Sequence, residues 1–159
     1  MLLAQLREPF STIALLCVCL GLRISEALAL RWCDVDWLGS TLTIQRAIVE
    51  RHVDVPKTEN SATSVNLSPE LLFRLRLLRQ TATFAAEQDW LFASPVKIGR
   101  LPYPYTGVWR DLQRAGTAAG LGRLGTHTFR TAFVPGWTLS EHLWQSSRKL
   151  CVMPISARP

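Results

Sequence analysis

The sequence of 159 residues has no long apolar run. Its main apolar run covers residues 13–22, which is too short for a helix that crosses a bilayer, since such a helix needs about 20 residues. Arg7 before this run fits a secretory signal, but Glu8 and Pro9 interrupt the expected layout and no small-residue cleavage site follows. We therefore expect neither a membrane-spanning segment nor a cleaved signal.

Metal-ligand spacing is also absent among the four cysteines, Cys17, Cys19, Cys33 and Cys151. Zinc sites bring cysteines and histidines together at short intervals, whereas Cys17 and Cys19 lie inside the apolar run with no histidine nearby. We expect buried, reduced thiols in a cytoplasmic protein and no metal ion.

Acidic side chains are scarce relative to basic ones. The sequence has 18 Lys and Arg against 12 Asp and Glu, which gives a net charge of +6 and a pI near 9.7. A basic excess of this kind favours a polyanionic partner. The length suits one domain with a core of ordinary size.

Proline and glycine mark the first helices. Pro9 in a first turn and Gly21 at the far end predict a helix from about residue 9 to 19, and a second helix starts at Arg23. Another helix is expected to begin near Thr126.

Two longer helices are predicted after residue 67. Ser68-Pro69-Glu70 is a strong helix start, and the helix that follows has leucines on its inner face and a basic face of Arg74, Arg76 and Arg79. That basic face is either solvated or in contact with a nucleic-acid backbone. The second of these helices should be capped by Thr106 and end at Gly120. Its expected core residues are Val108, Trp109, Leu112 and Ala115.

Between the helix that starts at Arg23 and the helix that starts at Ser68, the hydrophobic period changes. Residues 40–49 alternate polar and apolar as a half-buried strand does, and residues 52–55 and 64–67 are typical of two further strands. Residues 56–61 have the composition of a hairpin turn, with Lys57 at its tip. The sequence thus predicts an α+β fold that is mainly helical and contains a small three-stranded antiparallel sheet.

Arg23 stands at a glycine-led turn that opens into an apolar helix. Its guanidinium adds donors to the unpaired N–H groups and positive dipole end of that helix, a place that favours an anion and above all a phosphate. Glu26 follows one turn later and can hold Arg23 in a fixed rotamer. A solvated, salt-bridged face is the alternative interpretation.

His127 and Arg130 are three residues apart at the start of a predicted helix. Both side chains can therefore face one site beside free backbone amides. Each residue alone also has an ordinary explanation, as a turn-capping histidine or a surface arginine, and Lys57 alone could be a solvated turn residue.

As a set, these residues resemble the tyrosine recombinase (phage integrase) family. Residues 21–34, which include Arg23 and Glu26, are similar to its first arginine box. Residues 55–67, around Lys57, are similar to its lysine hairpin, and His127-x-x-Arg130 is similar to its second box. The resemblance covers about residues 2–133, so a catalytic domain of that family is expected over residues 1–133.

The resemblance implies DNA cleavage and rejoining by transesterification, without a metal, a cofactor or a small-molecule substrate. Arg23 and Arg130 would clamp the non-bridging oxygens of the scissile phosphate, and Glu26 would support Arg23. Lys57 would protonate the leaving 5′ oxygen, and His127 would assist proton transfer near the nucleophile. Double-stranded DNA is the implied partner, and an intact recombinase protomer is a second.

Two features of a complete family member are missing from the sequence. The chain starts almost directly in the catalytic domain, so we expect no amino-terminal core-binding domain. The family's nucleophilic tyrosine follows the second box, whereas the two tyrosines here, Tyr103 and Tyr105, precede it and are interpreted as loop residues. We expect a degenerate recombinase fragment that cannot cleave DNA alone. A DNA-binding or dominant-negative module and a plain α+β domain are the alternatives.

The tail, residues 134–159, stops resembling the family and lacks helical periodicity. A frameshift near the codon of Phe133 would explain the change. When the tail is read one base out of step, Trp137-Thr138 forces an aspartate, and the shifted frame can encode a segment similar to the family's next one, including its third-box histidine. We therefore expect the family's carboxy-terminal helices to be missing and the tail to be disordered.

The nucleotide sequence of the gene tests the frameshift hypothesis. One base should be missing near codon 133, and the shifted frame should stay open and encode a tyrosine several tens of residues beyond Arg130. A shifted frame that stops early, or that encodes no downstream tyrosine, would contradict the hypothesis.

Overall fold

The computed structural model describes residues 5–49, 52–54 and 63–122. In this part of the chain the helices are α1 (Phe10–Leu20), α2 (Ile24–Leu28), α3 (Pro69–Thr81) and α4 (Tyr105–Ala118), with 3₁₀ helices η2 (Trp32–Asp34) and η4 (Pro95–Lys97). The strands are β1 (Val35–Asp36), β2 (Thr41–Ile44), β3 (Ala47–Val49), β4 (His52–Asp54) and β5 (Thr63–Asn66). The mainly helical α+β fold with a small three-stranded antiparallel sheet is confirmed.

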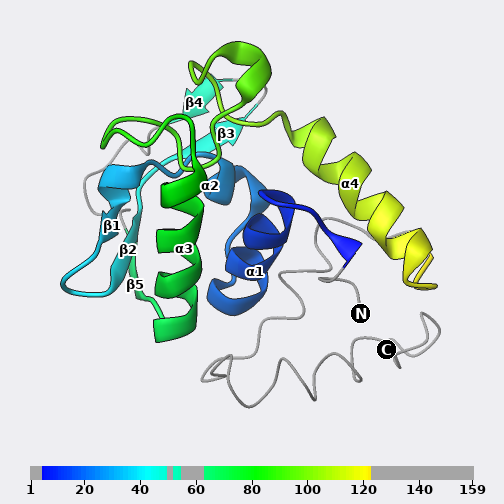
Figure 1. The fold of residues 1–159 in the computed structure, drawn as a ribbon, viewed down its shortest axis with the longest axis horizontal. Helices are drawn as coiled ribbons and strands as arrows, with labels where there is room; N and C mark the ends of the chain where they lie inside the picture. The colour runs from blue at the N-terminus through cyan, green and yellow to red at the C-terminus, as the bar shows by residue number, and fades with distance from the viewer. Residues whose placement is uncertain (1–4, 50–51, 55–62, 123–159) are drawn as a thin grey trace.

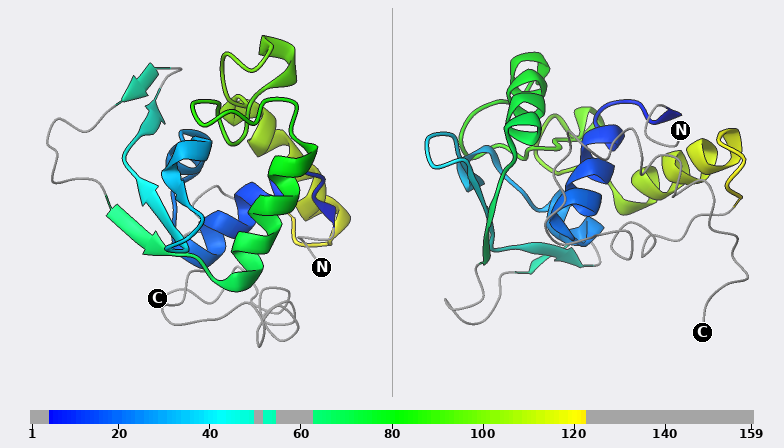
Figure 2. Two further views of the ribbon diagram at one scale, coloured as in Figure 1. Left: turned by 60° about the vertical axis from the view of Figure 1, so that its left-hand side comes forward. Right: turned by 90° about the horizontal axis from the view of Figure 1, so that it is seen from below.

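Helix α1 lies at the centre of the fold (Figures 1 and 2). It lies between α3 and α4, and the β1–β2–β5 sheet lies on the side of α3. Ile13, Leu16 and Cys17 on α1 are fully buried, so the apolar run of the sequence is a core helix. No helix in the described ranges is both long and apolar enough to cross a membrane. The other elements add Leu28, Trp32, Leu42, Leu75 and Val108 to the same core.

The predicted helix ends are mostly where the local chemistry placed them. Gly21 ends α1 in the left-handed conformation, with φ of 68°, which glycine adopts without strain. At the start of α3, the Ser68 hydroxyl accepts a hydrogen bond from the Leu71 N–H at 3.3 Å, and Pro69 is the first helical residue. Leu71, Leu72 and Leu75 are buried as expected.

Helix α4 differs from its prediction at two points. It begins at Tyr105 and not after a Thr106 cap, because the Pro104 carbonyl already accepts the N–H of Gly107 at 2.9 Å. Trp109 is 41% exposed, whereas Val108, Leu112 and Ala115 are buried. The three buried residues share one face, and Trp109 lies about 100° further around the helix.

The strand predicted over residues 40–49 is divided into two. β2 pairs with β1 and β5, while β3 pairs only with β4, so the described strands form two sheets. Gln45 and Arg46 lie between β2 and β3 and belong to neither strand. Their side chains donate hydrogen bonds to Asp34. Among the described strands, β4 pairs with β3 and β5 pairs with β2, so β4 and β5 are not paired with each other as predicted. Residues 55–62, which contain Lys57 and the predicted hairpin turn, lie outside the described residues.

The cysteines agree in part with the predicted buried thiols. Burial raises the pKa of Cys17 to about 12 and that of Cys19 to about 11, so both thiols are protonated at neutral pH. Cys33 is exposed, which corrects the prediction for that residue. Cys151 lies outside the described residues.

Candidate functional site

Arg23 lies at a sharp junction between two helices. Gly21 ends α1, the buried Leu22 anchors the link, and Arg23 caps α2 in an extended conformation with φ of −72° and ψ of 149°. The backbone at Arg23 is thus fixed by a core residue on one side and by a helix on the other.

Glu26 accepts hydrogen bonds from both the backbone and the side chain of Arg23. The Arg23 N–H donates to Oε2 of Glu26 at 2.7 Å, and Nη1 of Arg23 donates to Oε1 at 3.1 Å. The Arg23 side chain is nevertheless 60% exposed, so most of its guanidinium faces solvent. Because α2 has five residues, the guanidinium rather than the helix dipole is the main source of positive charge here.

The other predicted site residues, Lys57, His127 and Arg130, lie outside the described residues, as do the helix expected near Thr126 and the tail. Their meeting with Arg23 at one phosphate stays a prediction. Of the two tyrosines, Tyr103 packs edge-on against the Phe10 ring at 5.3 Å between centroids. Tyr105 is the first residue of α4 and not a loop residue.

A buried ion pair that the sequence analysis missed connects the arginine box to the strands. The Asp34 side chain is 1% exposed and accepts hydrogen bonds from the Arg31 N–H at 2.7 Å, Gln45 Nε2 at 2.8 Å and Arg46 Nη2 at 2.6 Å. Arg46, 15% exposed, also donates from Nε to the Ala29 carbonyl at 3.4 Å. The available sequence signal was an arginine at a position where alternation calls for an apolar side chain.

Trp32, inside the arginine box, and Trp37, just after it, have a structural role. Trp32 is fully buried, donates from Nε1 to the Phe84 carbonyl at 3.0 Å and stacks on Trp37 with 6.4 Å between ring centroids. The Arg79 guanidinium lies 5.6 and 5.5 Å from these two rings and also pairs with Glu87 at 3.3 Å. The Arg79 guanidinium therefore makes contacts within the fold, with two aromatic rings and a carboxylate.

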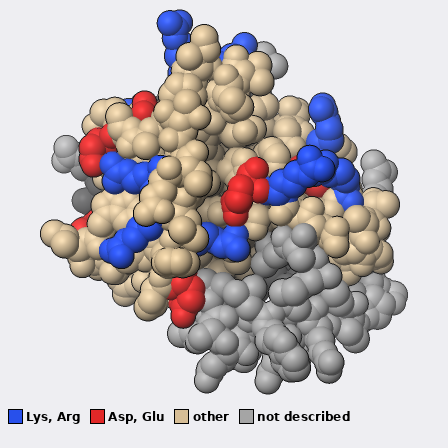
Figure 3. Space-filling model, in the orientation of Figure 1, with Lys and Arg blue, Asp and Glu red and all other residues tan. Residues whose placement is uncertain are grey.

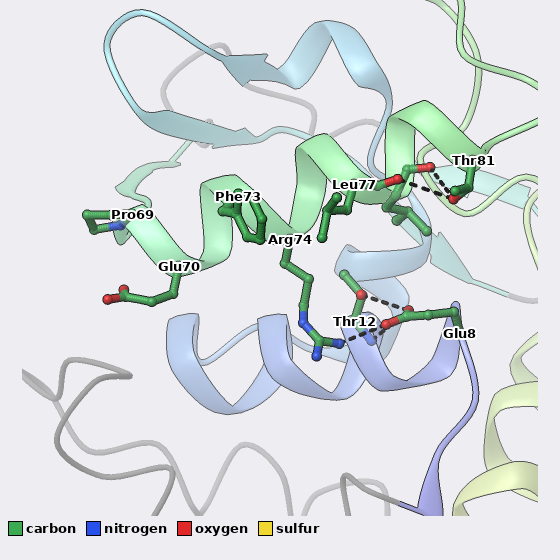
Figure 4. Close-up of a pocket in the computed structure, with 9 residues that line it drawn as sticks. Glu8, Thr12, Pro69, Glu70, Phe73, Arg74, Leu77 and Thr81 are labelled. Carbon is green, nitrogen blue, oxygen red and sulfur yellow. Dashed lines mark hydrogen bonds and ion pairs between the residues drawn. The ribbon is translucent and has the colours of Figure 1, made fainter.

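Arg74 also binds partners within the fold, in a groove between α1 and α3 (Figure 4). Its Nη1 pairs with Oε1 of Glu8 at 2.7 Å and donates to the Ser11 hydroxyl at 3.1 Å, and Thr12 donates to the other Glu8 oxygen at 2.8 Å. The predicted basic face of α3 thus reduces to Arg76. On the face turned forward in Figure 3, basic and acidic side chains are accordingly interspersed.

Comparison with known proteins decides the family. Residues 4–145 match the model of the phage integrase family. The chain belongs to the phage integrase family. This match extends past residue 133, where the sequence analysis ended the resemblance, and the domain boundary stays a prediction. No match was found among curated proteins.

Solved structures with the same fold include DNA complexes of an integrase. The Tn1549 transposon integrase with circular intermediate DNA has a TM-score of 0.65 and 17% identity, over 83% of this chain and 49% of that chain. The same integrase with transposon right end DNA has a TM-score of 0.61 and 17% identity, over 77% and 44%. This chain therefore spans about half the length of these structures.

The Asp34–Arg46 pair should be important for stability. Replacing Arg46 by Met leaves a buried carboxylate without its cation, so urea unfolding should show a loss of about 3 kcal/mol. Arg76→Met, at an exposed position on α3, should change stability by less than about 0.5 kcal/mol. Adding Asp34→Asn to Arg46→Met should cost less than the sum of the two single losses, and strict additivity would contradict the pairing.

Proposed function

We propose that this chain is the DNA-binding catalytic-domain portion of a site-specific tyrosine recombinase that acts in DNA recombination and integration. The observation that carries the proposal is Arg23, held by Glu26 at a rigid junction with its guanidinium largely exposed, inside a segment that matches the phage integrase family. The DNA complexes of the Tn1549 integrase support duplex DNA as the partner.

The proposed chemistry is binding and polarisation of one backbone phosphate. A guanidinium can donate two parallel hydrogen bonds to phosphate oxygens, and the bond to Glu26 occupies only part of its donors. Arg130 would bind oxygens of the same phosphate. Lys57 would protonate the leaving oxygen, and His127 would assist proton transfer near the attacking oxygen. These groups would stabilise the charge that grows in the transition state.

The chain would not cleave DNA by itself. No tyrosine follows Arg130 in the sequence, and Tyr103 packs against the core at Phe10. Loss of a nucleophile in a well-studied protease costs about 10⁶ in rate. The chain would then occupy DNA without cutting it, either alone or paired with an intact recombinase protomer, as a dominant-negative module does.

A gel-shift titration with duplex DNA tests the binding. The affinity of the chain should fall steeply with added salt, and Arg23→Ala should weaken binding about tenfold and lower the salt slope by about 1. Arg76→Ala removes the same charge from an exposed site on α3 and should change the affinity less than twofold. Equal losses for both variants would indicate general charge attraction and contradict a specific role for Arg23.

A suicide-substrate assay tests the loss of cleavage. Duplexes that the chain binds, nicked so that a covalent protein–DNA adduct accumulates, should give no adduct with this chain. The gene with its reading frame restored at codon 133 is the matched positive control and should give one. An adduct on Tyr103 or Tyr105 of the unmodified chain would contradict the proposal.

A further inference from the structure

Residues 94–101 form a closed loop that contains η4 and projects from the fold at the top of Figure 1. The Ser94 N–H donates to the Leu101 carbonyl at 2.8 Å, and the Gly99 N–H donates to the Ser94 carbonyl at 3.1 Å. Trp90, which is buried, donates from Nε1 to the Arg100 carbonyl at 3.2 Å. The loop is therefore pinned to the core and has its own internal hydrogen bonds.

The side chains on this loop are apolar and basic, and they face solvent. Val96 is 84% exposed and Ile98 is 72% exposed, and Leu101, Lys97 and Arg100 are exposed beside them. No acidic residue occurs between Asp89 and Asp111 in the sequence. In Figure 3, basic side chains project at the upper edge of the molecule, where this loop lies, and the acidic side chains lie lower on that face.

The loop also holds backbone strain. Ile98 adopts φ of 50° and ψ of 43°, the left-handed conformation that a β-branched residue rarely takes. The next residue, Gly99, has φ of 71°, and a Cβ there would lie 2.5 Å from the Phe84 ring. The loop thus packs against Phe84, while Ile98 keeps most of its surface exposed in a strained backbone conformation. Strain of this kind is concentrated at ligand-binding positions.

We propose that loop 94–101 is a DNA contact, in which Lys97 and Arg100 bind backbone phosphates and Ile98 with Val96 packs against the minor-groove edge. Apolar side chains flanked by cations suit that groove, where proteins insert aliphatic residues between base steps. The inference rests on the proposed function. An anionic membrane would attract the same charges, but the loop has no aromatic residue to anchor it at a lipid interface.

Charge removal in the full chain tests the phosphate contacts. Lys97→Gln with Arg100→Gln should weaken duplex binding at least tenfold and lower the salt slope by about 2. The matched control, Arg7→Gln with Arg76→Gln, removes two exposed charges elsewhere and should change the affinity less than threefold. If wild type binds duplex DNA and both double variants bind equally well, the loop inference is overturned while the proposed function stands.

Ile98→Asn separates a binding role from a structural one. Asn accepts the left-handed conformation, so the variant should unfold at a higher temperature than wild type yet bind duplex DNA several-fold more weakly. Lower stability with unchanged affinity would overturn the inference.

Wild-type chain that binds no duplex DNA would overturn the proposed function and the inference together. Loop-dependent binding to phosphatidylserine vesicles in place of DNA would assign the loop to a membrane.

Discussion

The buried carboxylate of Asp34 is the constraint on which the rest of the structure depends. A charge removed from water must be paired and fully hydrogen-bonded, and Arg46, Gln45 and the Arg31 N–H supply those partners. These donors come from the end of the arginine box and from the break between β2 and β3. One interaction therefore fixes the strands against α2 and interrupts the long strand that alternation alone would produce.

Two groups of positive charges in the described part of the chain differ in their partners. Arg46, Arg74 and Arg79 have carboxylate partners and stabilise contacts between elements. Arg23 is held by Glu26 but remains largely exposed, and Lys97 and Arg100 project from a pinned loop. A phosphate-binding function is reasonable for the second group. The fold orients these cations but leaves them exposed, so they can still bind a phosphate. The net charge of +6 alone could not make that distinction.

Local signals predicted the local structure well. Ser68-Pro69 and Gly21 fixed helix ends because capping depends on neighbouring residues only. A tertiary contact explains why the strand predicted over residues 40–49 is interrupted. The Arg46 side chain pairs with Asp34, which lies twelve residues earlier in the chain. The arginine box was identified from its resemblance to the family's motif, and the expected contact between Arg23 and Glu26 is present. Lys57, His127 and Arg130 stay predictions, since their geometry lies outside the described residues.

The most direct measurement is a crystal structure of this chain bound to a DNA duplex that it recognises. The account predicts that the guanidinium groups of Arg23 and Arg130 lie within hydrogen-bond distance of the oxygens of one backbone phosphate, with no tyrosine hydroxyl in line with it. An Arg23 side chain turned away from the DNA, or two arginines on different phosphates, would contradict it.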